Sequence, residues 1–309
     1  MSQQLKLSAH LVEIFTPYRH DEKRMLAVLE RALALGCYSN AEITTFQDAE
    51  DRRRVRSLLE KNHVTALTYV TPYVGERGLS LCDLDEGGRR AALGLVKLHA
   101  ELAADAGCNR FGIPSGNYPG DAKKDDAMKR MTDSMVEIAE YCQTLGMDVT
   151  IEPCDRYTYK KQLIGPIAEV TEWIGKIRET CPNVYLHWDC AHAALAGEDL
   201  IESLRIAAPY TAQIHLCDAI LDPENPFFGD LHKDVARAPE WETEGILTPE
   251  AGAAILKEAV SLDKPSTLKT DVHVSVEVMG HPGDDLWLKE ENARKYILHA
   301  AELAGVVLH

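Results

Sequence analysis

Short apolar segments alternate with amphipathic segments along the chain of 309 residues, and this alternation constrains the fold more than any motif does. Eight of the short segments are rich in β-branched residues and predict strands. They cover residues 5–12, 41–46, 64–70, 109–114, 147–153, 184–189, 211–217 and 272–278. Strands that alternate with helices pair in parallel through right-handed crossovers. The chain is therefore predicted to be an α/β protein with a parallel sheet.

Eight amphipathic segments follow these strands and carry the signals that begin and end helices. The first places Met25 and Leu29 on one face and closes at Gly36, which suits the position after a helix. Thr248 and Pro249 form an N-cap followed by proline at the first helical position. The predicted helices cover residues 21–36, 48–62, 85–107, 125–146, 166–180, 199–208, 249–262 and 284–305.

Eight strand–helix units in one chain predict a (β/α)8 TIM barrel, and residues 1–309 are predicted to form a single domain. A doubly wound open sheet is the alternative. That fold usually has a glycine-rich dinucleotide-binding turn after its first strand, and the residues after the first predicted strand contain no such turn. The barrel is therefore the favoured architecture.

Acidic residues outnumber basic ones, with 49 Asp and Glu against 33 Lys and Arg and a net charge of −16. Such a chain repels phosphate backbones and anionic lipids, so we expect no nucleic-acid partner and no membrane partner. The longest segment without charged residues, 62–75, has 14 residues, against roughly 18–20 needed to span a bilayer. The N-terminal residues lack the apolar core of a signal peptide, and a cytoplasmic location is expected.

Eight cysteines are distributed along the chain without a C-x-x-C spacing. A chain of this length buries a core of its own and needs no disulfide framework. We expect reduced, mostly buried thiols that behave as small apolar residues.

Ionisable residues stand at the ends of four consecutive predicted strands. Glu152, Asp189, His215 and Glu277 each lie inside or directly after an apolar run. In a barrel these strand ends meet at the active face, where an unpaired buried charge costs several kcal/mol. Carboxylate and imidazole ligands suit Mn²⁺, Mg²⁺ or Co²⁺, and Zn²⁺ is also compatible. One divalent cation is therefore predicted. The alternatives are that separate partners satisfy each residue, or that Cys190 or Cys217 contributes to a zinc site.

The motifs around these residues carry a resemblance to a known family. Glu152-Pro153, Asp189-x-x-His192, His215-x-x-Asp218 and the final-strand Glu277 resemble the xylose isomerase-like TIM-barrel superfamily. Within it, the chain is most similar to the ketose 3-epimerase and hydroxypyruvate isomerase group. The resemblance implies one Mn²⁺-like ion held by Glu152, Asp189, His215 and Glu277. It also implies that the two glutamates are catalytic residues that move protons, and that His192 binds substrate hydroxyls.

The segment 218–247 after the seventh predicted strand departs from that group because it is long. It contains His232 and Arg237, which we consider candidate substrate contacts. Its aromatic residues suggest either a lid over the site or a contact in a homo-oligomer, and the two readings are equally favoured. At the start of the segment, Asp218 is expected to orient His215 or a substrate group.

Weaker candidates lie near the other strand ends. His10, Tyr69 and Asn117 are possible pocket residues, although a packing or turn role is favoured for each. His10 is kept as a candidate substrate contact. His187 lies two residues before Asp189, on the same strand face, so it is expected to point into the barrel.

The implied chemistry is isomerisation or epimerisation of a sugar by proton transfer next to a carbonyl, through a metal-stabilised enediolate. The same groups would also serve a metal-dependent lyase or dehydratase acting on a keto-sugar or an inosose. An apurinic endonuclease is disfavoured by the acidic balance, and a barrel without catalysis is disfavoured by the four ionisable residues. The expected partner is a small sugar or keto-sugar.

Overall fold

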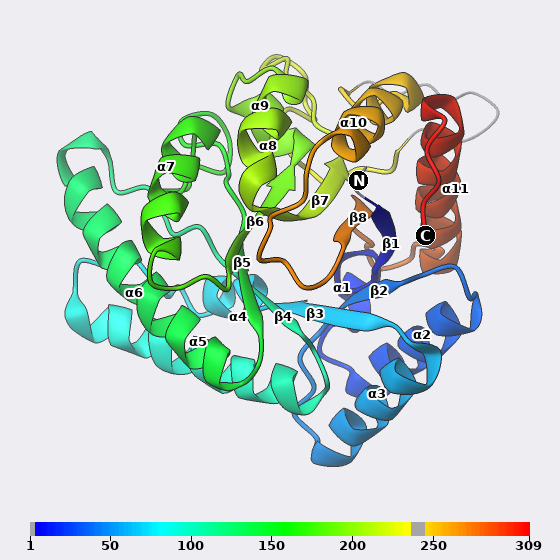
Figure 1. Ribbon diagram of the computed structural model, residues 1–309, viewed down its shortest axis with the longest axis horizontal. Coiled ribbons are helices and arrows are strands. Elements are labelled where there is room, and N and C mark those ends of the chain that lie inside the picture. Colours follow the sequence, from blue (N-terminus) through cyan, green and yellow to red (C-terminus); the bar gives the residue numbers. More distant parts are fainter. Residues whose placement is uncertain (1–3, 236–244) are drawn as a thin grey trace.

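The computed structural model of the protein describes residues 4–235 and 245–309. Eight parallel strands close into a barrel in the order in which they occur in the chain (Figure 1). The strands are β1 (Leu5–His10), β2 (Asn40–Ile43), β3 (Thr65–Tyr69), β4 (Arg110–Ile113), β5 (Asp148–Ile151), β6 (Val184–Asp189), β7 (Thr211–Cys217) and β8 (Val272–Glu277). The (β/α)8 TIM barrel predicted from the sequence is confirmed.

The pairing of the first strand with the last one closes the barrel. Leu5 of β1 lies opposite Val272 of β8 in a parallel register. On the side that becomes the site, Asp189 of β6 lies opposite His215 of β7, and Cys217 of β7 lies opposite Glu277 of β8. The carboxyl ends of β6, β7 and β8 are therefore adjacent, as parallel pairing requires.

Helices surround the barrel and form its outer layer (Figure 1). All eight predicted helices are present, and most end one or two residues before the predicted boundary. They are α2 (Glu22–Ala34), α3 (Ala49–Asn62), α5 (Glu86–Asp105), α6 (Lys124–Thr144), α7 (Ile167–Arg178), α9 (Leu200–Ala207), α10 (Pro249–Ser261) and α11 (Leu286–Ala304). Three further short helices follow strands at the barrel mouth. They are α1 (Leu11–Ile14), α4 (Thr71–Glu76) and α8 (Cys190–Leu195).

The interior of the barrel holds polar side chains. The guanidinium of Arg110, 1% exposed, donates hydrogen bonds to the carbonyl oxygen of Ala212 at 2.8 Å and to Thr270 Oγ1 at 2.8 Å. The same guanidinium lies 3.2 Å from His273 Nδ1. A buried polar group is tolerated when it is hydrogen-bonded, and these contacts make the barrel floor a fixed polar network.

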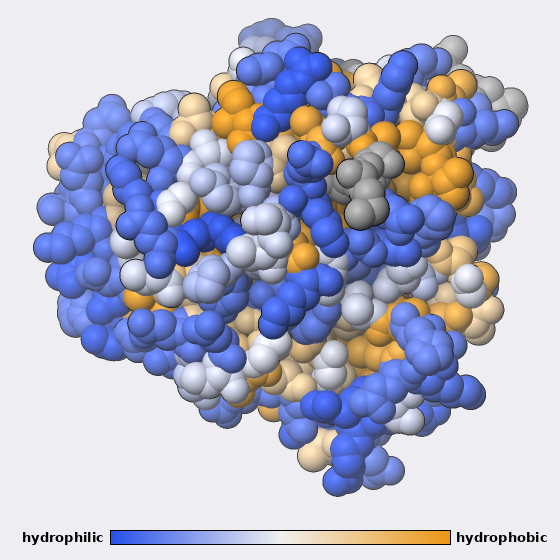
Figure 2. Space-filling view, in the orientation of Figure 1, coloured by the Kyte–Doolittle hydropathy of each residue, from blue (hydrophilic) through white to orange (hydrophobic). Residues whose placement is uncertain are grey.

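The eight cysteines are free thiols, and all but Cys37 are buried. Cys190 begins α8 and donates to the carbonyl oxygen of Cys217 at 3.2 Å, while Cys217 Sγ lies 3.1 Å from Asp230 Oδ1. Neither Cys190 nor Cys217 lines the cavity described below. None of the helices in residues 4–235 and 245–309 combines the length and the apolar character that a membrane span requires. Figure 2 shows a face that is mostly hydrophilic, with apolar residues in small patches between charged ones.

Most of the outer helices have a side-chain N-cap. Asp199 accepts hydrogen bonds from the backbone amides of Ile201 at 3.1 Å and Glu202 at 2.9 Å at the start of α9. We expect Asp199→Ala to lower the free energy of unfolding by about 1 kcal/mol, because two amides lose their acceptor. Urea denaturation monitored by circular dichroism measures this change. Asp263→Ala, at an exposed position that caps no helix, is the control, and an equal loss there would contradict the assignment.

Candidate active site and metal centre

The four strand-end residues predicted from the sequence converge at one end of the barrel. Asp189 and Glu277 are the last residues of β6 and β8, His215 lies in β7, and Glu152 directly follows β5. One ligand atom from each lies within 4.8 Å of those of the other three. We call these residues, Glu152, Asp189, His215 and Glu277, the quartet. Because they come from four consecutive strands, the barrel itself sets their spacing.

Two oxygen atoms of the quartet are buried without a hydrogen-bond donor among the described residues. One is Glu152 Oε1 and the other is Asp189 Oδ2. The second oxygen of Asp189 is occupied, because it accepts from the backbone amides of Ala191 at 2.7 Å and His192 at 3.1 Å. The N-terminus of α8 thus fixes the Asp189 carboxylate and leaves its other oxygen free. This arrangement fits a cation ligand.

Two carboxylates of the quartet, Glu152 and Asp189, resist ionisation in the absence of a cation, whereas the neighbouring His232 and His215 hold the pKa of Glu277 well below its usual value despite its burial. Burial, opposed by His192 and reinforced by the negative charge of Glu277, raises the pKa of Glu152 to about 7. Burial likewise raises the pKa of Asp189 to about 6. A divalent cation would offset the cost of placing three carboxylates together, so the donor set fits a metal ion.

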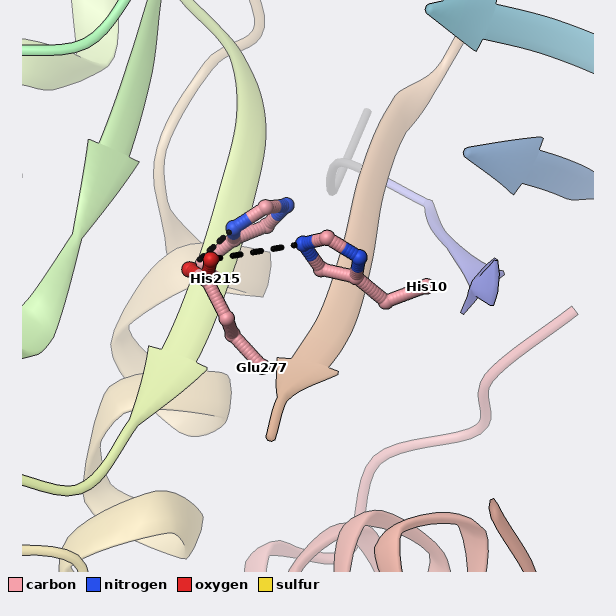
Figure 3. A group of neighbouring side chains, drawn as sticks. All are labelled: His10, His215 and Glu277. Carbon is pink, nitrogen blue, oxygen red and sulfur yellow. Dashed lines mark hydrogen bonds and ion pairs between the residues drawn. The ribbon is translucent and has the colours of Figure 1, made fainter. Parts of the chain in front are cut away.

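His215 lies between two carboxylates. Its Nδ1 is 2.9 Å from Glu277 Oε2, and its Nε2 is 2.8 Å from Oε2 of Glu42, a residue of β2. Burial opposes protonation of His215, but the two carboxylates raise its pKa well above the usual value. His10 approaches the other oxygen of Glu277 with its Nε2, at 3.6 Å (Figure 3). His10 thus lies next to the quartet.

A cavity of about 370 Å³ opens beside the quartet, within the range of sites that hold small molecules. Glu152, His215 and Glu277 line it, whereas Asp189 does not. The lining also includes four further histidines and a set of apolar side chains. The additional histidines are His10, His187, His192 and His232, and the apolar wall includes Val12, Pro72, Val74, Leu79, Leu81 and Ile113.

His10, Tyr69 and Asn117 all lie on the cavity wall. The sequence favoured a packing or turn role for these three residues. Their position on the cavity wall differs from that expectation. His187 points into the barrel as predicted, and its ring centroid lies 3.7 Å from that of His215. Both ring nitrogens of His187 lack a hydrogen-bond partner among the described residues.

The predicted substrate contacts divide into those at the cavity and those elsewhere. His192 lines the cavity with its Nε2 3.6 Å from Glu152 Oε1, and His232 also lines it. Asp218 does not line the cavity, and its Oδ1 accepts from the backbone amide of Leu247 at 2.9 Å. Asp218 follows the last residue of β7, Cys217, so strand alternation no longer sets the direction of its side chain. Arg237 lies outside the described residues.

A second cluster of charged side chains lies at the cavity mouth. The sequence analysis identified one of its members, His232, and missed the others. His232 Nδ1 lies 3.1 Å from Glu13 Oε1, and its Nε2 lies 3.0 Å from Asp230 Oδ2. Lys160 Nζ lies 2.9 Å from the same oxygen of Asp230. Glu13, Lys160 and Asp230 lie in a short helix or in loops, where sequence periodicity gives no signal. Together with His232 they supply hydrogen-bonding groups beside the quartet.

The aromatic residues of the segment 218–247 do not cover the cavity within the described residues. Phe227 is 48% exposed, and Phe228 packs edge-on against Tyr159 with the ring centroids 6.1 Å apart. Neither phenylalanine lines the cavity. The lid reading of the sequence therefore gains no support from these two residues.

Comparisons with known proteins agree with this architecture. Among solved structures, the chain is similar to a D-psicose 3-epimerase determined in the presence of D-fructose, with a TM-score of 0.66, 16% identity and coverage of 91% of this chain and 94% of that one. An L-ribulose 3-epimerase gives a TM-score of 0.67 at 15% identity, with coverage of 99% and 96%. A 3-keto-D-glucoside 4-epimerase from E. coli gives 0.62 at 15% identity, with coverage of 88% and 93%.

At these identities the structural matches establish the fold. No curated protein matches the chain in sequence. A family model described as xylose isomerase-like TIM barrel matches residues 29–247, which is more than half of the chain. The protein therefore belongs to the xylose isomerase-like TIM barrel family.

Proposed function

We propose that the protein is a divalent-metal-dependent sugar epimerase or isomerase that transfers a proton next to a carbonyl group. The observation that carries this proposal is the quartet at the cavity, with two buried carboxylate oxygens that have no hydrogen-bond donor among the described residues. Glu152, Asp189, His215 and Glu277 would hold the ion, and Mn²⁺ is the favoured metal. Bound there, the ion would polarise a substrate carbonyl and stabilise the negative charge that develops on deprotonation.

The accessibility of the carboxylates supports a division of roles within the quartet. Glu152 and Glu277 line the cavity and would reach both a bound ion and a substrate, whereas Asp189 does not line it. We therefore assign proton transfer to Glu152 and Glu277. They come from strands on different sides of β6 and β7, so one would remove a proton and the other would return one. Asp189 and His215 would act as ligands of the ion only.

The walls of the cavity support a sugar substrate. His192, His232 and Lys160 offer hydrogen-bonding groups to hydroxyls, and His10 lies beside Glu277. The apolar wall, which includes Val12 and Leu79, suits the C–H faces of a sugar. The structural neighbours named above as epimerases of D-psicose, L-ribulose and a 3-keto-D-glucoside also support a sugar substrate. Homo-oligomerisation and a cytoplasmic location stay predictions from the sequence.

A panel of ketoses and 3-keto-glucosides, incubated with the Mn²⁺-loaded protein in D₂O and followed by proton NMR, tests the proposal. We expect deuterium to enter one carbon next to a carbonyl while an epimer or isomer accumulates. Protein stripped of metal by a chelator is the control. An unsaturated product would indicate elimination of water or of an aglycone instead. Absence of both exchange and product, in protein shown to bind Mn²⁺, would contradict the proposed reaction.

A further inference from the structure

Glu42 of β2 is a buried carboxylate that contacts the quartet without belonging to it. Its side chain is 0% exposed, and its Oε2 lies 2.8 Å from His215 Nε2. Glu277 occupies the other side of the same ring, with its Oε2 2.9 Å from His215 Nδ1. His215 is therefore held between one carboxylate inside the quartet and one outside it.

We propose that Glu42 is a positioning residue that keeps the proton of His215 on Nε2 and leaves Nδ1 to bind the divalent cation. This inference rests on the metal site of the proposed function. Nδ1 is the nitrogen that faces Glu277, a member of the quartet, so it is the one directed toward the ion. A histidine ligand commonly donates its other N–H to a carboxylate, which fixes the tautomer and the ring orientation and makes the ligating nitrogen more basic.

The surroundings of Glu42 fix its position and its charge. Ser8 Oγ and Gln213 Nε2 donate to Oε1, both at 2.8 Å. Tyr69 donates its hydroxyl to Oε2 at 2.9 Å, beside the contact with His215. A carboxylate surrounded by donors on both oxygens is favoured as the anion. Glu42 is thus a preorganised acceptor for the Nε2–H of His215.

Glu42 differs in its contacts from the residues that would bind the ion or the substrate. It does not line the cavity, and both its oxygens already accept hydrogen bonds. Glu152 and Asp189 each have a buried oxygen without a hydrogen-bond partner among the described residues. Glu42 therefore acts through His215, and neither touches the substrate nor ligates the ion.

The test is Glu42→Gln, with binding of Mn²⁺ alone measured by EPR titration of the metal-stripped protein. We expect the Kd for Mn²⁺ to rise roughly 10- to 100-fold, as for other losses of a group that orients a ligand. The visible absorption spectrum of the Co²⁺-loaded variant should also shift, because the orientation of His215 changes. The matched control is Glu290→Gln on α11, since Glu290 is 3% exposed and pairs with Arg294 away from the quartet. It should bind Mn²⁺ like the wild type.

Ser8→Ala provides a milder variant if Glu42→Gln does not fold. It removes one donor to Glu42 and leaves every quartet residue in place, so the Kd should rise about two- to tenfold. Wild-type Mn²⁺ affinity and an unchanged Co²⁺ spectrum in a folded Glu42→Gln protein, or in Ser8→Ala where that protein does not fold, would overturn the inference. So would a wild type that binds no Mn²⁺. If the wild type binds Mn²⁺ and Glu42→Gln binds it weakly, but no sugar reacts, the proposed reaction fails while the role of Glu42 stands.

Discussion

Glutamine in place of Glu152 or of Glu277 is expected to lower kcat by roughly 10²–10⁴-fold. Both residues line the cavity and belong to the quartet, so each substitution keeps an oxygen near the ion and removes a group that accepts a proton. Binding of Mn²⁺ should weaken yet stay measurable, because an amide oxygen still reaches the site. Steady-state kinetics with the substrate found in the sugar panel, together with Mn²⁺ titration, measure the two effects separately.

Isotope exchange in D₂O distinguishes the two glutamates. When one group removes the proton and the other returns it, one of the two variants should still exchange the substrate hydrogen without forming product. Glu76→Gln is the matched control, since Glu76 lies on α4 with its side chain 43% exposed, outside the cavity wall. Its kcat and KM should equal those of the wild type. Near-normal turnover in both quartet variants would refute the assignment and direct attention to His192 and His232.

The barrel was predictable from the sequence because its signal repeats. Each strand is a short apolar run, and the helices carry caps such as Asp48, Asp85 and Thr248. The quartet was predictable for a related reason: a charged residue inside an apolar strand needs a partner, and parallel strands bring their ends together. Glu42 is also a charged residue inside an apolar strand, within residues 41–46, but it stands near the start of that predicted strand, so the pattern of strand-end residues does not include it.

The cavity mouth was less predictable because loops carry no periodicity. Lys160 and Asp230 lie in different loops, and Lys160 Nζ is 2.9 Å from Asp230 Oδ2. No local sequence pattern predicts this contact. Asp218 shows the opposite case, since its sequence spacing from His215 suggested a shared site. Its carboxylate instead accepts from the backbone of Leu247 and secures the return of the chain toward α10. Spacing on a strand predicts the face of a side chain, whereas past the strand end it does not.

Removal of the divalent cation is expected to abolish turnover and to lower the melting temperature. Without the ion, Glu152 and Asp189 must be buried as costly anions or take up protons, because burial raises the pKa of Glu152 to about 7 and that of Asp189 to about 6. An ion present at about 100 times its Kd stabilises the folded state by roughly 2.7 kcal/mol. For 309 residues this corresponds to about 4 °C in Tm. Differential scanning calorimetry before and after chelation measures the shift, and added Mn²⁺ or Co²⁺ should restore both Tm and activity.

Asp189→Asn shows whether the shift arises at the quartet. The asparagine side-chain oxygen would still accept from the backbone amides of Ala191 and His192, so the start of α8 is retained. The variant loses a negative charge from the ion site, and its Tm should respond to Mn²⁺ far less than that of the wild type. The N-cap variant Asp199→Ala is the matched control: it begins at a lower Tm and should keep the full response to Mn²⁺. Equal stability and activity of the metal-free and metal-loaded wild type would mean that the quartet is structural, since hydrogen bonds and the buried histidines would then suffice to hold its charges.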